Sequence, residues 1–363
     1  MQRHGAARPH HGADVTTSYR PAVPPSDPGP DGGVRLRARR PADLLAAVPF
    51  LLGFHPEESL VALFLQSGRV VLTARYDLGD HRGRDLADLV EQHRPTGMVL
   101  VAYCADAARG RAELRAQADE LSALDQRPRP DLVDLLLVDG RTWWSLVCSS
   151  GCCPGEGTPY APGEHPLSAE AVWAGLVARP DRAAVVATVA GPSAGDWPGL
   201  RDRARPIRAR LWRATRTERQ DALGRAVVAG LPRVDPALEV GAAGGLDDEA
   251  CLELALLVRD TLVRDVACAL VTRDDARRHL ALWQEVVRRT PPELAPAPLC
   301  LVGIAAWAGG NGTVLNACCD RLAELDPAYP MGRLLSDVSR RALPPAWWDA
   351  MADGLRRDLG LEV

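Results

Sequence analysis

The 363-residue chain contains no lysine, because all 43 of its basic residues are arginine. A P-loop needs a lysine on the nucleotide phosphates, and a protein kinase needs one on a strand of its nucleotide-binding lobe. Schiff-base and pyridoxal chemistry need a lysine amine. The sequence therefore excludes these classes of enzyme.

Long apolar runs are also missing. No stretch approaches the roughly 20 residues of a membrane-spanning helix, and the N-terminus lacks the apolar segment of a secretion signal. The net charge of −4 argues against a general polyanion binder and against a polybasic membrane-surface protein. We therefore predict a cytoplasmic protein, in which the nine cysteines are reduced thiols or metal ligands rather than disulfides.

The first 33 residues have almost no large apolar side chains and are rich in proline, glycine, histidine and serine. Such a segment cannot bury enough surface to offset the entropy of ordering, so residues 1–33 are predicted to be a disordered tail. The remaining length is enough for roughly two domains of about 150 residues each.

Residues 34–150 have the pattern of an α/β domain with a mixed sheet and central hairpins. Residues 60–65 are continuously apolar, as in a strand buried on both faces, and residues 70–77 alternate with a period of two. Ser67-Gly68 indicates a turn between these strands. The other predicted elements are a strand at 34–37, a helix at 43–52 that Pro49 should kink or end, a helix at 84–94, a strand at 98–103, a helix at 109–124, and strands at 132–138 and 142–147 joined by a turn at Asp139-Gly140.

A Cys/Gly/Pro loop and linker at 151–167 precedes a different pattern. From residue 168 to 363 the sequence predicts an all-helical domain, with proline and glycine clusters between helices. The predicted helices cover residues 171–177, 181–189, 199–229, 247–271, 273–289, 297–308, 312–325, 330–342 and 345–358.

Three cysteines form the best candidate for a metal site. Cys148, Cys152 and Cys153 lie within six residues of one another and could supply most of a tetrahedral zinc site, with His165 or Cys104 as the fourth ligand. Four protein ligands would make the zinc structural. Loop thiols packed at the domain junction, and a redox or nucleophilic thiol, are the alternatives.

The loop His55-Pro56-Glu57-Glu58-Ser59 precedes the first central strand and carries groups suited to acid–base chemistry. His55, Glu58 and Ser59 are therefore candidate ligand-binding residues, and His55 with Glu58 is a candidate catalytic pair. The alternative is a turn in which Ser59 bonds the local backbone.

Two further segments have the pattern of a functional motif. Gly191-Pro192-Ser193-Ala194-Gly195 matches a nucleophile elbow but lacks the strand that must precede it, so we reject that interpretation. Residues 201–225 hold nine arginines against Asp202, Glu218 and Asp221. This segment could contact phosphates, but arginines spread around a helix favour a solvated helix paired to acidic neighbours.

Several segments together resemble an actinobacterial family known as domain of unknown function 4192. They are Pro41–Leu45, Gly53–Val61, Gly68–Thr73, Trp143–Cys148 with Cys152–Pro159, and Gly310–Gly312 with Asp326–Tyr329. The resemblance covers most of residues 34–350, and it implies no established reaction, ligand or partner.

From the residues we favour a non-catalytic protein that binds a ligand or partner at the junction of its two domains, near His55, Glu58 and the cysteine loop. One alternative is a hydrolase or transferase that uses His55 and Glu58. The other is nucleic-acid association through residues 201–225.

Overall fold

A computed structural model describes residues 14–16, 35–79, 83–124, 129–148, 154–234 and 245–361. The chain divides into two compact units. Among the described residues, 14–16, 35–51 and 56–174 belong to the first unit, and 52–55 and 175–361 belong to the second.

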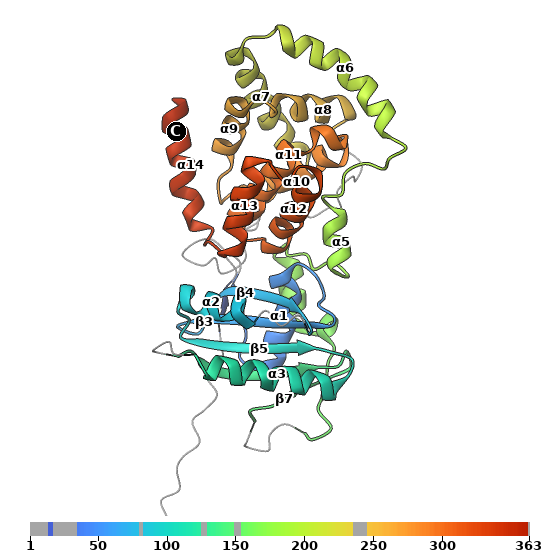
Figure 1. Cartoon of the computed structure of the whole chain (residues 1–363). Coiled ribbons are helices and arrows are strands. Elements are labelled where there is room, and N and C mark those ends of the chain that lie inside the picture. Colours follow the sequence, from blue (N-terminus) through green and yellow to red (C-terminus); the bar gives the residue numbers. More distant parts are fainter. Residues whose placement is uncertain are drawn as a thin grey trace, which may run out of the picture. The chain divides into compact units, whose positions relative to one another are not determined.

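The first unit is built on a mixed β-sheet (Figure 1). The order of the described strands is β2-β1-β4-β3-β5-β6-β7-β8. Their bounds are β1 Asp14–Thr16, β2 Arg35–Arg37, β3 Ser59–Gln66, β4 Arg69–Asp77, β5 Gly97–Tyr103, β6 Asp131–Val138, β7 Thr142–Ser145 and β8 Thr158–Pro159. β3 pairs antiparallel with both β4 and β5, so the predicted hairpin does lie inside the sheet. β5 and β6 are parallel and are joined through a helix.

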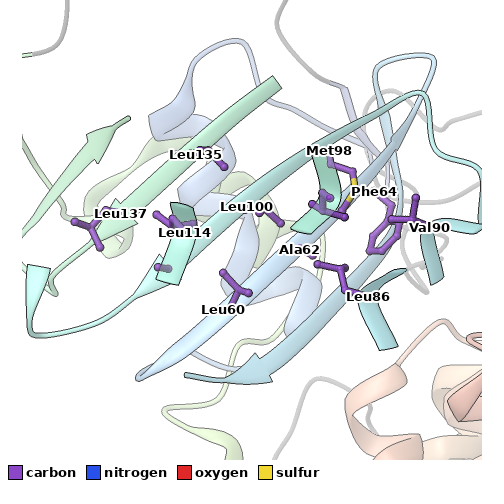
Figure 2. Packing of buried hydrophobic residues seen from close by; sticks show 12 residues of the cluster. Leu60, Ala62, Phe64, Leu86, Val90, Met98, Leu100, Leu114, Leu135 and Leu137 are labelled. Atoms are coloured by element: carbon purple, nitrogen blue, oxygen red, sulfur yellow. The ribbon is translucent and has the colours of Figure 1, made fainter. Parts of the chain in front are cut away.

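One face of the sheet is covered by α2 and α3, and α1 lies on the other side (Figure 1). The helices of this unit are α1 Pro41–Leu52, whose last residue belongs to the second unit, α2 Gly83–His93, α3 Ala107–Ser122 and α4 Pro166–Trp173, with a short 3₁₀ turn η1 at Pro162–Glu164. Figure 2 shows the core beneath α2 and α3, where alternate residues of β3, β5 and β6 meet Leu86, Val90 and Leu114. The continuous apolar run of β3 is buried from Ser59 to Leu65, which confirms that this strand is covered on both faces.

The second unit is helical in its described residues. It contains α5 Arg182–Ala187, α6 Trp197–Arg213, α7 Arg216–Gly230, η2 Leu231–Arg233, α8 Asp248–Leu257, α9 Thr261–Leu270, α10 Ala276–Arg288, η3 Pro292–Leu294, α11 Pro296–Ala308, α12 Gly312–Leu325, α13 Pro330–Arg340 and α14 Ala346–Leu359. α11 is buried from Ala297 to Ala308, which places it at the centre of this unit. No helix in the described part of the chain is long and apolar enough to span a membrane. The predicted fold class, an α/β unit followed by a helical one, is confirmed.

Several element boundaries differ from the prediction. Pro49 lies inside α1, which continues for three residues beyond it to Leu52, although a proline at this position removes one backbone donor of the helix. The segment 199–229 is two helices, since Thr215 and Glu218 form a capping box that starts α7. The segment 247–271 is also two, because the Asp260 side chain accepts from the Leu262 N–H and starts α9.

Two other differences concern the ends of elements. The helix expected at 171–177 occupies Pro166–Trp173 instead, because the His165 ring serves as its N-cap. Within the predicted disordered tail, residues 14–16 form β1, which pairs with β2. The other residues of that tail, 1–13 and 17–33, lie outside the described part of the structure.

Candidate functional site

Glu58 lies in the loop before β3 and connects three segments of the first unit. Its Oε2 is 2.9 Å from Nη1 of Arg109, and its Oε1 accepts a 3.0 Å hydrogen bond from the Ala105 N–H. Its carbonyl accepts from the Leu78 N–H at 3.0 Å. The backbone φ of Glu58 is +40°, a conformation that costs a non-glycine residue on the order of 1–3 kcal/mol. These bonds hold the loop in that conformation.

The start of α3 supplies the groups that bind the Glu58 carboxylate. Asp106 is the N-cap, and its side chain accepts from the N–H groups of Ala108 and Arg109. Arg109 also donates from Nη2 to the Leu78 carbonyl at 3.2 Å. The positive end of the α3 dipole thus faces the carboxylates of Asp106 and Glu58.

Glu58, Asp106 and Arg109 lie at a place in the fold where α/β proteins commonly bind ligands. It follows the carboxyl end of β5, whose neighbour β6 runs parallel to it, and the α3 crossover begins there. In open α/β sheets, ligands bind outside the carboxyl ends of parallel strands. The side chains of Glu58 and Arg109 are 51% and 52% exposed, so the ion pair is accessible from solvent.

Ser59 is fully buried, and its hydroxyl is used within the protein. It donates to the Glu57 carbonyl at 2.5 Å and accepts from Nε of Arg75 at 2.8 Å. Arg75 also pairs with Asp77 through a 2.6 Å contact. Ser59 therefore fixes the start of β3 against the end of β4, and the local backbone bond expected from the sequence is present.

Substituting Ser59 with alanine is expected to lower the free energy of unfolding by about 1–3 kcal/mol, because two hydrogen bonds of a buried hydroxyl are lost and each contributes about 0.5–1.5 kcal/mol. Urea denaturation followed by circular dichroism measures the change. Ser122→Ala is the matched control, since the Ser122 hydroxyl makes an exposed bond to the Ala118 carbonyl. A loss at Ser59 no larger than the loss at Ser122 would contradict the bridging role.

His55 is exposed and belongs to the second unit. Its N–H donates to the Arg179 carbonyl at 3.0 Å, and the neighbouring Phe54 forms a β-bridge with Arg179. Glu58 belongs to the first unit. The pairing of His55 with Glu58 as acid and base therefore stays a prediction.

The proposed zinc ligands are described only in part. Cys148 is half-buried after β7, whereas Cys152 and Cys153 lie outside the described residues. Both ring nitrogens of His165 are engaged: Nδ1 accepts from the Leu167 N–H at 3.2 Å, and Nε2 is 3.2 Å from Oδ1 of Asp43. Binding zinc would break the cap of α4 if it used Nδ1 of His165, and the contact with Asp43 if it used Nε2.

Cys104, the other proposed fourth ligand, lies at the end of β5 and is 3% exposed. Burial raises the pKa of its thiol, which disfavours the thiolate that both zinc binding and nucleophilic attack require. Within the described residues, no group of three or more His, Cys, Asp or Glu side chains could hold a metal ion. The zinc site at Cys148, Cys152 and Cys153 stays a prediction.

The segment 201–225 is paired to acidic neighbours along part of its surface. Arg203 and Arg210 of α6 form ion pairs with Asp248 and Glu253 of α8. Arg216 and Arg219 of α7 both reach Asp260. The interpretation of a helix paired to acids therefore holds for these four arginines.

The rejected nucleophile elbow follows helix α5, not a strand, and the Ser193 hydroxyl donates to Asp196 at 2.7 Å.

Arg109 and Asp43 are site residues that the sequence did not single out. The signal for Asp43 was an acidic residue in a first helical turn, whereas Arg109 gives no local signal because its partners come from distant loops.

A family of known proteins matches most of this chain. The model of a family described as Domain of unknown function (DUF4192) matches residues 41–346. No curated protein and no solved structure matches the chain. The match includes the Glu58 loop, α3 and the helical unit as far as the start of α14. The actinobacterial source suggested by the sequence stays a prediction.

Proposed function

The chain belongs to the DUF4192 family, which is defined by a domain of unknown function, and from the geometry at the carboxyl end of β5 we propose that it is a non-catalytic ligand-binding protein. The ligand is a small molecule bearing a carboxylate or phosphate, held at the carboxyl end of β5. The observation that carries the proposal is the half-exposed ion pair of Glu58 with Arg109.

The ion pair suits exchange with an anionic ligand. An exposed arginine–carboxylate pair contributes about 0–1 kcal/mol, so a ligand anion can displace Glu58 from Arg109 at low cost. Arginine presents a planar fork that matches carboxylates and phosphates in a bidentate geometry. The strained backbone of Glu58 also makes a change in this loop less costly.

The neighbouring groups support binding more than catalysis. The Ser59 hydroxyl is buried between Glu57 and Arg75, and the Cys104 thiol has a raised pKa. The hydrolase or transferase hypothesis needs Glu58 to exchange a proton, yet each of its oxygens already accepts a hydrogen bond. A binding site shared with His55 at the junction of the two domains, and a regulatory role, stay predictions.

Arg109→Gln is expected to abolish the response to anionic ligands, and Glu58→Gln is expected to strengthen it, because the competing carboxylate is then absent. The measurement is differential scanning fluorimetry with phosphate, citrate and nucleoside monophosphates, followed by calorimetry on any compound that raises Tm. A bound ligand at about 100 times its Kd stabilises the folded state by about 2.7 kcal/mol.

Arg115→Gln is the matched control, because Arg115 is an exposed arginine on the same helix. It should respond to the ligands like the wild type. If no compound raises Tm, or if Arg109→Gln responds as strongly as Arg115→Gln, the proposed site is wrong.

A further inference from the structure

The arginines of α6 fall on two flanks with different surroundings. The buried face of this helix packs inward through residues Leu200, Ala204, Ile207 and Leu211. On one side of that face, Arg203 and Arg210 are neutralised by Asp248 and Glu253 of α8. Figure 1 shows α6 at the margin of the helical unit. On its other flank Arg201, in the first turns of the helix, pairs with Glu293, whereas the residues further along that flank are exposed.

The second flank carries a line of three side chains. Arg205, Arg208 and Trp212 are spaced at i, i+3 and i+7, which places them on one side of a helix over about 10 Å of its length. The Arg205 side chain is 71% exposed and Trp212 is 86% exposed. We call these three residues the α6 stripe.

The positive charge of the α6 stripe is largely uncompensated. Within the described residues, Arg205 pairs with Asp202 on its own helix, whose side chain is 66% exposed, and such a pair contributes about 0–1 kcal/mol. Arg208 is exposed and forms no ion pair with the residues that the structure describes. α6 as a whole has six arginines and one aspartate.

We propose that the α6 stripe binds single-stranded nucleic acid, with Arg205 and Arg208 on phosphates and the Trp212 indole stacked on a base. Proteins that hold single strands combine a positive track for the backbone with aromatic side chains on which bases stack. This proposal concerns a different surface from the Glu58–Arg109 site and does not depend on the proposed ligand-binding function.

Two features of the α6 stripe favour a nucleic acid over an acidic protein. The centre of a protein–protein interface is depleted of charged residues and buries about 800 Å² on each partner. The α6 stripe is narrow, with one aromatic side chain between arginines, since Arg213, which directly follows Trp212 in the sequence, is also exposed. The net charge of −4 for the whole chain does not oppose local binding, because acidic residues of α8 are already paired with the other flank.

The test is fluorescence anisotropy of the full chain with a labelled 20-nucleotide single strand of mixed sequence, once as DNA and once as RNA. We expect Trp212→Ala to weaken binding between about five- and 150-fold, the range for losing one stacked base. Each lost phosphate contact should reduce the slope of log Kobs against log salt by about 0.7, so Arg205→Gln with Arg208→Gln should reduce it by about 1.4.

Matched controls remove the same chemistry elsewhere on the helical unit. Arg321→Gln with Arg340→Gln removes two arginines that, like Arg205, pair with an acidic residue three positions away, and Trp347→Ala removes another exposed tryptophan. Both controls should bind like the wild type. Arg321 is half-buried and the other positions are exposed, so circular dichroism should show folded variants.

Three results would overturn the proposal. The first is no binding of either strand at 0.1 M salt. The second is equal binding by Trp212→Ala and Trp347→Ala, which would remove the stacking contact. The third is equal competition by polyglutamate, which would identify the α6 stripe as a site for acidic polypeptides. A preference between the DNA and RNA strands would assign the natural ligand class.

Discussion

Glu285→Ala is expected to lower the free energy of unfolding of the helical unit by about 3–5 kcal/mol, the usual loss when one partner of a buried ion pair is removed. The Glu285 side chain is 5% exposed and binds Arg288 through two bonds of 2.9 and 3.1 Å. It also pairs with Arg289. Alanine would remove this carboxylate from Arg288, whose side chain is 37% exposed, and from Arg289, which is 20% exposed and keeps its pair with Asp248.

The network around Glu285 extends beyond α10. Nε of Arg289 is 3.0 Å from Asp248 of α8, and Asp248 also binds Arg203 of α6. The side chains therefore tie α6, α8 and α10 together. Because their contributions depend on one another, Glu285→Ala should also loosen α6.

Urea denaturation followed by circular dichroism measures the loss. Asp337→Ala is the matched control, since Asp337 pairs with Arg340 three residues later but its side chain is 58% exposed. Its expected loss is below about 1 kcal/mol. If Glu285→Ala costs no more than Asp337→Ala, the network does not stabilise the unit.

The parts of the fold that the sequence predicted correctly depend on local patterns. The unbroken apolar run before Gln66 identified β3, and Asp139-Gly140 identified the turn between β6 and β7. The division of residues 199–229 into two helices also has a local signal, since Thr215 and Glu218 have the spacing of a capping box. Helical periodicity alone shows no break there, which is why a single helix was predicted.

The candidate site could be predicted only in part. Glu58 was singled out because it precedes an apolar strand, but its partners Arg109 and Ala105 lie about 50 residues further along the chain. Their approach depends on the order of β3 and β5 in the sheet, which no short-range pattern encodes. The two flanks of α6 were missed for the same reason, because the acids that neutralise one flank belong to α8.

Phe64→Ala is expected to lower the stability of the first unit by about 3–5 kcal/mol, the typical cost of removing a buried aromatic ring. Phe64 is fully buried and lies among Leu86, Val90 and Met98 (Figure 2). Its ring meets His93 edge to face, with centroids 6.5 Å apart. For a unit of this size the loss corresponds to a fall in Tm of about 6 °C or more.

Val71→Ala on the neighbouring strand β4 is the control, because Val71 is 57% exposed and a surface change stays within about 0.5 kcal/mol. Calorimetry of Phe64→Ala beside Glu285→Ala also tests the proposed division into an α/β domain at 34–150 and a helical domain at 168–363. Independent domains melt in separate transitions, so each variant should lower one transition and leave the other unchanged. If both variants lower a single transition together, the two domains fold as one cooperative unit and the proposed division is wrong.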